Sequence, residues 1–333
     1  MGCKCGKKVL EPIYTPVASV QRTSYTYEEA EPEILHASSS EEAVEESKLF
    51  LYCFNDPEVP TKLLQYEANS HQLETLDLPL KLYSECGIVC FNNSRVIFAG
   101  GYDLFCSSEV KNCFVLECSG GELSEISSLP SARRRLRLIQ VEDSVYAVGG
   151  VREIQTRTDF AKAIYQDYSE SLSKYLPRED KWEQLPDLPK GVEFPAVYSV
   201  ASKIYVCGGL QIEGNSNHVL DEIQTFDVQK SAWSVLGVKL PVPLFLHQAV
   251  FCGEFVVIFG GNDGEENVHK TFMLKDEKIK EMASLPEKHC SSFPYSVLRD
   301  GLQIFTFNED NFLYTLNTSL SCWTVCNLSE IGC

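Results

Sequence analysis

Four apolar runs along the chain each end in a pair of glycines, and they recur at a nearly regular spacing. They read RVIFAGG at 95–101, SVYAVGG at 144–150, KIYVCGG at 203–209 and FVVIFGG at 255–261. The last glycines of successive runs are 49, 59 and 52 residues apart. Self-similarity at a period of about fifty residues indicates an array of repeated structural units.

A second signal keeps the same spacing. A leucine–proline pair precedes each glycine doublet, in DLP at 77–79, SLP at 128–130, DLP at 187–189 and KLP at 239–241. A fifth pair, in SLP at 284–286, precedes QIFTFNED (303–310), which keeps the apolar run without the glycines. KLFLYCFND (48–56) resembles another degenerate copy, so we count six units.

Each unit divides into short strand-like runs. The fourth unit contains GVEFPAVYSVAS (191–202), KIYVCGG (203–209), EIQTFDV (222–228) and SAWSVLG (231–237), separated by Gly, Asn, Asp and Ser. These turn residues and the lack of a helical period predict four short strands per unit. Four strands in about fifty residues favour an all-β array of propeller blades.

The repeat resembles the kelch family, whose pattern is a strand ending in Gly-Gly, a strand bearing tyrosine, and a tryptophan soon after. The third unit has Tyr175 and Trp182, the fourth has Phe226 and Trp233, and the sixth has Tyr314 and Trp323. The glycines of the pattern are Gly100, Gly101, Gly149, Gly150, Gly208, Gly209, Gly260 and Gly261. WD-type repeats have a shorter period and a Trp-Asp dipeptide, which is absent here. The resemblance implies a six-bladed kelch-type β-propeller over about 48–329.

Physical chemistry adds two expectations to this fold. The glycine pairs should adopt positive φ at the strand ends, where backbones approach closely. Trp182, Trp233 and Trp323 should lie at equivalent places, each buried between neighbouring sheets. The first unit lacks an innermost strand of its own, so either residues within 9–47 supply it or the ring closes by side-chain packing alone.

Composition excludes several classes of function. The net charge of −18 argues against nucleic acid as the main partner, because phosphate binding needs a basic surface. No run approaches eighteen apolar residues, which argues against a transmembrane helix. Several of the 14 cysteines sit in apolar runs, and the six histidines show no metal-ligand spacing, so we expect neither a disulfide framework nor a metal or other cofactor.

The candidate binding residues follow the leucine–proline pairs. Arg133 and Arg135 lie in SARRRLRL (131–138), at the start of an inner strand, and His289 holds the equivalent place in the sixth unit. In kelch-like propellers such loops line one mouth of the ring, where guanidinium groups can hold an acidic peptide. The alternatives are that the arginines pair with the protein's own carboxylates and that His289 is structural.

The widest interval between repeats holds an insertion at 151–173. Its mixed charges accompany a partly helical period through Phe160, Ile164 and Tyr168. Long loops on rigid scaffolds often carry function. The other interpretation is a tolerated surface insertion.

The chain begins MGCKCGKK, which resembles the dual-acylation leaders of membrane-tethered kinases and G-protein α subunits. The resemblance implies myristate on Gly2 and palmitate on Cys3 and Cys5, and hence a tether to the cytoplasmic face of a membrane. Gly6 stands where the usual pattern has Ser or Thr. An unmodified, mobile terminus is the alternative.

Residues 9–47 show no repeat and are rich in glutamate. High charge with few apolar residues predicts an acidic, mostly disordered spacer. Within it, SSSEEAVEES (38–47) also has the pattern of a short capped helix.

These features predict a non-enzymatic protein–protein interaction scaffold that binds a protein or peptide at the propeller mouth. The alternative is a propeller enzyme of oxidase or lyase type. Among the histidines, the repeat pattern allows only His247 and His289 to face inward, and no ligand motif joins them. The sequence leaves the partner's identity and the oligomeric state open.

Overall fold

The computed structural model describes most of the repeat region. It covers residues 48–53, 62–67, 72–78, 83–158, 161–213, 216–286, 298–300, 303–307 and 312–327 of the chain. All of these belong to one compact unit, Glu45–Cys333. In this part of the chain, no helix is long and apolar enough to cross a membrane. Gly2, Cys3, Cys5, the acidic spacer and His289 lie outside the described residues.

Five antiparallel sheets of four strands follow one another along the described chain, and each is named here as a blade after its first strand. The β4 blade comprises β4 (Gly87–Phe91), β5 (Arg95–Ala99), β8 (Cys113–Glu117) and β9 (Glu122–Ile126). The β10 blade comprises β10 (Arg137–Val141), β11 (Ser144–Val148), β14 (Leu172–Leu176) and β15 (Lys181–Leu185). The β16 blade comprises β16 (Ala196–Val200), β17 (Lys203–Cys207), β20 (Ile223–Asp227) and β21 (Ala232–Val235).

The remaining strands complete the array. The β22 blade comprises β22 (Gln248–Phe251), β23 (Val256–Phe259), β24 (Thr271–Lys275) and β25 (Lys278–Glu281). The β26 blade comprises β26 (Leu298–Asp300), β27 (Gln303–Phe307), β28 (Phe312–Asn317) and β29 (Cys322–Asn327). A three-stranded sheet, the β1 sheet, comprises β1 (Lys48–Cys53), β2 (Lys62–Glu67) and β3 (Gln72–Asp77).

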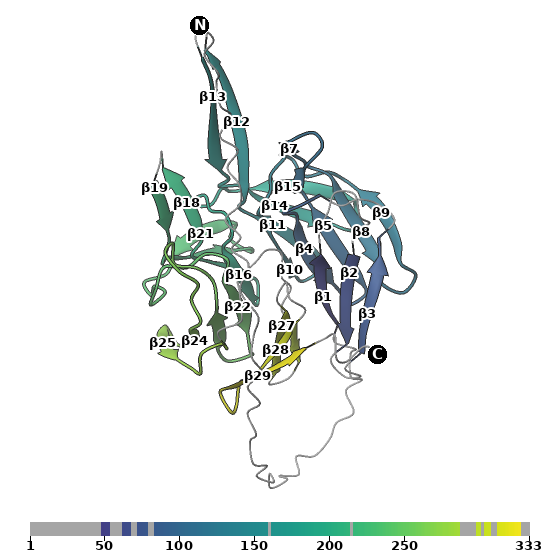
Figure 1. The fold of residues 1–333 in the computed structure, drawn as a ribbon. Coiled ribbons are helices and arrows are strands. Elements are labelled where there is room, and N and C mark those ends of the chain that lie inside the picture. The colour runs from purple at the N-terminus through teal and green to yellow at the C-terminus, as the bar shows by residue number, and fades with distance from the viewer. Residues whose placement is uncertain are drawn as a thin grey trace, which may run out of the picture. The chain divides into compact units, whose positions relative to one another are not determined.

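The first strands of four successive blades, from the β4 blade to the β22 blade, stand side by side in an all-β propeller. Contacts join β4 to β10, β10 to β16 and β16 to β22, and β1 contacts β27 of the last blade (Figure 1). The apolar core lies between the sheets: one cluster, for example, joins Ile97 and Leu136 to Trp182 across the β4 and β10 blades. Such stacking buries both faces of sheets that could not bury them alone.

The glycine doublets adopt positive φ, as the sequence predicted. The φ values are 64° and 115° at Gly100 and Gly101, and 62° and 106° at Gly149 and Gly150. The second glycine also links blades, since Gly150 N donates to Val192 O of the following inter-blade loop at 2.8 Å. A Cβ on Gly150 would lie 2.7 Å from Arg134 O, so this close approach requires glycine.

The three tryptophans lie at equivalent places in fourth strands, which confirms that part of the sequence prediction. The expected burial holds for Trp182 alone, because Trp233 and Trp323 are only half-buried. Trp182 pairs with Tyr175, Trp233 with Phe226 and Trp323 with Leu316 of the third strand. Each indole N–H donates to the preceding blade, at Ser127 O (2.8 Å), Pro186 O (2.8 Å) and Thr271 Oγ1 (3.1 Å) respectively. The residue in the tyrosine place of the last blade is therefore Leu316. Its assignment to Tyr314 was wrong, because Tyr314 pairs with Val325.

The insertion is a β-hairpin rather than a partly helical segment. β12 (Val151–Thr158) and β13 (Ala161–Tyr168) pair in antiparallel register from Val151–Tyr168 to Thr158–Ala161, and the hairpin extends away from the sheets (Figure 1). The helical expectation failed because Ile164 and Tyr168 are an even number of residues apart, so a strand also places them on one face.

Antiparallel order gives each blade two distinct ends. The inter-blade loops lie at the same end as the connections between second and third strands, which we call the hairpin end. Three of these connections contain hairpins: β6 (Tyr102–Asp103) with β7 (Ser108–Glu109), β12 with β13, and β18 (Leu210–Glu213) with β19 (Ser216–Val219). The tight turns between first and second strands, and between third and fourth, lie at the opposite end, which we call the turn end.

Candidate functional site

The inter-blade loops form a hydrogen-bonded chain at the hairpin end. Glu85, Arg135, Phe194 and Leu246 occupy successive loops and have φ values of 53°, 60°, 52° and 57°. Arg135 N donates to Glu85 O (2.9 Å), Phe194 N to Arg135 O (3.3 Å) and Leu246 N to Phe194 O (3.0 Å). This backbone chain holds four loops together and places their side chains around a common region.

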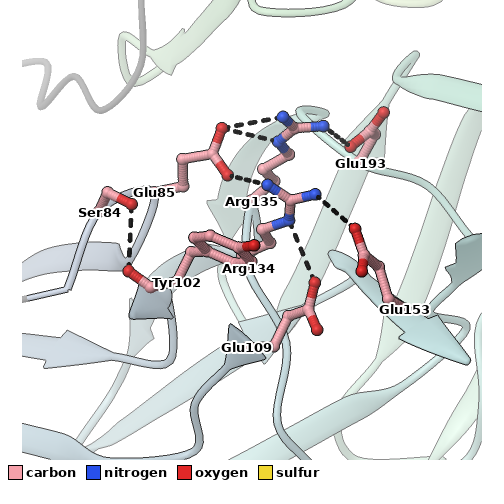
Figure 2. A network of polar contacts seen from close by, with 8 residues as sticks. All are labelled: Ser84, Glu85, Tyr102, Glu109, Arg134, Arg135, Glu153 and Glu193. Carbon is pink, nitrogen blue, oxygen red and sulfur yellow. Dashed lines mark hydrogen bonds and ion pairs between the residues drawn. The ribbon is translucent and has the colours of Figure 1, made fainter. Parts of the chain in front are cut away.

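Arg135 lies between two glutamates from the neighbouring blades' loops (Figure 2). Its Nε donates to Glu85 Oε1 at 2.9 Å, and Nη2 lies 2.9 Å from the same oxygen. Its Nη1 donates to Glu193 Oε2 at 3.0 Å. The guanidinium carbon is 4.9 Å from the centre of the Phe194 ring. All three nitrogens therefore face carboxylates of the protein itself.

Arg134 is enclosed in the same way. Its Nη1 lies 2.9 Å from Glu85 Oε2, its Nε 3.3 Å from Glu109 Oε1 and its Nη2 3.7 Å from Glu153 Oε1. The guanidinium also lies over the Tyr102 ring, 4.7 Å from its centre. We call Arg134, Arg135 and their four glutamates the carboxylate network (Figure 2).

Burial sets the electrostatics of this network. The Glu193 side chain is 1% exposed. Burial raises the pKa of Glu193, and the Arg135 guanidinium acts in the opposite direction. Burial alone would lower the pKa of Arg135, but the Glu85 and Glu193 carboxylates outweigh it and raise the pKa. Four glutamates around two arginines leave no excess positive charge here for an acidic ligand.

Arg133 is a structural residue, and its assignment to partner binding was wrong. It is 0% exposed and donates to Ala147 O at 3.2 Å, Ser171 O at 2.9 Å and Ser173 Oγ at 3.1 Å. A longer contact of 3.4 Å joins it to Ser169 Oγ. Burial lowers the pKa of Arg133 to about 10, so the group stays protonated at neutral pH. It ties its loop to the strands of its own blade and cannot touch a partner.

Arg135 lies in an inter-blade loop at the hairpin end, as expected for a residue in the loops that line one mouth of the ring. The alternative, that these arginines pair with the protein's own carboxylates, is confirmed for it. Arg134, Glu85 and Glu193 were not among the binding residues predicted from the sequence. A signal was present, since Arg134 and Glu193 both stand five residues after the leucine of a leucine–proline pair.

His247 does not face an open mouth. It is 0% exposed, and neither ring nitrogen has a hydrogen-bond partner among the described residues. Burial, with a contribution from Arg137, lowers the pKa of His247 to about 3. Within the described ranges, no three His, Cys, Asp or Glu side chains gather in a group that could hold a metal ion.

An exposed apolar tip adjoins the carboxylate network. Leu104 and Phe105, in the turn between β6 and β7, are 44% and 74% exposed. Asp103 Oδ1 shapes this turn by accepting the backbone N–H groups of Phe105 (2.8 Å) and Cys106 (3.2 Å). The same hairpin carries Glu109 of the network. β7 also contacts β12, and β13 contacts β18, so the three hairpins adjoin one another.

The chain is similar to proteins built on kelch repeats. It is 28% identical to beta-scruin of Limulus polyphemus over 51% of this chain and 18% of that protein. It is 27% identical to kelch-like protein 25 of Xenopus tropicalis (56% and 30%) and 24% identical to kelch-like protein 38 of Mus musculus (60% and 32%). The chain thus spans less than a third of the length of these relatives. No family model matches it. The similarities support a kelch-repeat family for the propeller.

Proposed function

We propose that this kelch-type protein is a non-enzymatic interaction scaffold, with six blades and a partner-binding surface at the hairpin end. The β1 sheet would be the sixth blade. It contacts β27 of the β26 blade, and its β1 run, KLFLYC, matches the second strands of the other units. The residues within 9–47 that were expected as one source of its innermost strand lie outside the described part of the chain.

The exposed β6–β7 tip is the observation that carries this proposal. Phe105 is the more exposed of two large apolar side chains on a hairpin that also carries Glu109 of the network. Aromatic side chains of this kind commonly anchor protein interfaces. The partner is a protein or peptide. The expectation that this ligand is acidic is no longer supported, because Arg133 is buried and Arg135 is paired with glutamates.

A capture experiment tests the binding surface. Tagged full-length protein is expressed in its own cells, and captured proteins are quantified by mass spectrometry for wild type and for Leu104→Ser/Phe105→Ser. Leu320→Ser is the matched control, because Leu320 is also 74% exposed but lies in the β28–β29 turn, at the turn end. We expect the double variant to lose partners that the control keeps. Equal capture by all three proteins would contradict the proposal.

The scaffold is further proposed to be anchored to the cytoplasmic face of a membrane through Gly2, Cys3 and Cys5. One myristoyl chain gives only about 10⁴ M⁻¹ of reversible binding, so a second signal is needed. Palmitate on the cysteines would supply it, and each lysine of MGCKCGKK adds roughly 1 kcal/mol against an anionic leaflet. As a flexible chain, the acidic spacer reaches on the order of 35 Å. That exceeds the roughly 8 Å over which surface charge acts at physiological salt.

Fractionation tests the anchor separately from partner binding. Wild type, Gly2→Ala and Cys3→Ser/Cys5→Ser are expressed in the protein's own cells and divided into membrane and soluble fractions. The wild type should be enriched in the membrane fraction and both variants depleted. If Gly2→Ala remains on membranes as well as wild type does, or if all three are soluble, the anchor is refuted.

A further inference from the structure

A cavity of about 230 Å³ lies between the β4 and β10 blades, at the turn end. Its apolar floor comes from the β4 blade, at Ile97, Val115 and Ile126. The far wall is Tyr175 of the β10 blade, and Asp180 of the β14–β15 turn borders the opening. The cavity is thus at the opposite end of the blades from the carboxylate network.

The equivalent places in the next two blades hold tyrosine side chains. Ile97, which pairs with Val115, stands three residues before its glycine doublet, as do Tyr146 and Tyr205 in theirs. The Tyr146 ring is buried, with Lys174 Nζ 5.8 Å from its centre. The Tyr205 ring stacks on Tyr198, with centroids 4.7 Å apart. The β4 blade has Ile97 and Val115 where the β10 blade has Tyr146 and Lys174. These shorter side chains leave the space beside them open.

The rim of the cavity carries more negative than positive charge. Arg95 Nε lies 2.7 Å from Glu117 Oε1, and their side chains are 45% and 35% exposed. Asp180 Oδ1 accepts the backbone N–H of Ser127 and the hydroxyl of Tyr175, both at 2.8 Å. The hydrogen bond from Ser127 is the main reason why the pKa of Asp180 is lowered. Two carboxylates therefore surround the opening with one guanidinium.

We propose that this cavity binds one aromatic side chain of a partner protein, flanked in the partner's sequence by lysine or arginine. A dry cavity of about 150 Å³ is enough for benzene, and sites for whole small molecules run from about 300 Å³ upward. A space of about 230 Å³ therefore suits a single phenyl or indole ring. The excess of carboxylates over Arg95 at the rim selects the basic neighbours. Because the cavity is at the turn end, this inference does not depend on binding at the hairpin end.

Methyl NMR on the full-length protein tests the site with defined probes. The probe is the blocked peptide Lys-Trp-Lys, with Lys-Ala-Lys and Glu-Trp-Glu as comparisons. We expect Lys-Trp-Lys to shift the methyl signals of Ile97 and Ile126 saturably, while those of Ile204 and Ile223, buried in other interfaces, stay fixed. Lys-Ala-Lys should have no effect and Glu-Trp-Glu should bind several-fold more weakly. No saturable shift up to about 5 mM Lys-Trp-Lys, or equal binding of the two tryptophan peptides, would overturn the proposal.

Two variants assign any binding to the cavity itself. Val115→Phe fills the floor and should weaken Lys-Trp-Lys binding at least about tenfold. Lys174 occupies the position in the β10 blade that is equivalent to Val115 in the β4 blade. Lys174→Phe therefore introduces the same side chain outside the cavity and should leave binding unchanged. Unchanged binding by Val115→Phe, or equal loss in both, refutes the site. If Val115→Phe does not fold, Glu117→Lys serves instead, at a rim position whose side chain is 35% exposed. This variant must weaken the binding of Lys-Trp-Lys and strengthen that of Glu-Trp-Glu.

Discussion

The Glu193 carboxylate lies 3.0 Å from the Arg135 guanidinium, although the two residues are 58 positions apart and belong to the loops of neighbouring blades. The backbone repeats this link, because Phe194 N donates to Arg135 O at 3.3 Å. The pair therefore joins the β10 and β16 blades where their loops meet. The Glu193 side chain is 1% exposed and that of Arg135 22%, which distinguishes the pair from surface ion pairs, because those contribute little.

Removing Glu193 should destabilise the protein substantially. Glu193→Ala leaves the half-buried Arg135 with Glu85 alone, so we expect a loss of about 2–3 kcal/mol in the free energy of unfolding. Glu183→Ala is the control, since its pair with Lys181 has the same 3.0 Å separation but side chains that are 58% and 39% exposed. That variant should cost less than about 1 kcal/mol. Urea melts measure both, and equal losses would show that burial does not decide the contribution.

The two kinds of positive-φ glycine should differ in their tolerance of a side chain. Gly121 has φ of 67° with no atom within 4 Å of an added Cβ, whereas Gly150 has φ of 106° and a Cβ would lie 2.7 Å from Arg134 O. Gly121→Ala should cost about 1–2 kcal/mol, from backbone strain alone. Gly150→Ala adds a backbone clash to that strain and should cost more than about 3 kcal/mol. Similar denaturation midpoints for the two variants would contradict this explanation.

Trp182 stabilises the protein through packing and through one hydrogen bond, and two substitutions separate these contributions. Trp182→Ala removes a side chain that is 8% exposed and should cost about 3–5 kcal/mol. Trp182→Phe keeps a ring beside Tyr175 but loses the bond to Ser127 O, for about 1 kcal/mol. Trp233 is only half-buried, so Trp233→Ala should cost less than Trp182→Ala. Denaturant unfolding of the three variants checks the order, and a larger loss for Trp233→Ala would reverse it.

Features set by local chemistry could be predicted from the sequence. A glycine doublet after an apolar run marks a strand that ends in positive φ, and Trp182 and Trp233 each follow the residue at the tyrosine place of their unit by seven positions. The positions of the glycines and of the tryptophans in the blades were therefore predicted correctly. The β12–β13 hairpin did not emerge, because its apolar spacing fits a helix and a strand equally well.

Features set by distant contacts could not be predicted. Arg133 was assigned to the partner-binding mouth because it lies in a basic stretch at the start of an inner strand. Its acceptors on Ser171 and Ser173 are 38 and 40 positions away, and only the fold brings them together. The Glu193 partner of Arg135 and the cavity beside Ile97 are likewise relations between blades. A repeat pattern describes each blade separately and does not predict which residues of the neighbouring blade contact it.

His247 should make the stability of the protein depend on pH. Its pKa is lowered to about 3 in the folded protein, mainly by burial, against about 6.5 in an unfolded chain. Between these values the unfolded chain binds more protons at this site than the folded protein does. The contribution is therefore fully present above pH about 6.5 and is lost as pH falls, by up to about 1.4 kcal/mol per pH unit.

Replacing His247 by a residue that does not titrate should remove this part of the acid sensitivity. We expect the free energy of unfolding of wild type to fall between pH 7.5 and pH 4.5 by about 2–3 kcal/mol more than that of His247→Leu or His247→Asn. Urea unfolding at the two pH values measures the difference. The two replacements differ in polarity, so they should change stability at pH 7.5 by different amounts while sharing the shallower pH dependence. If either variant lost stability with acid as steeply as wild type does, protonation of His247 would not be the cause of the acid sensitivity.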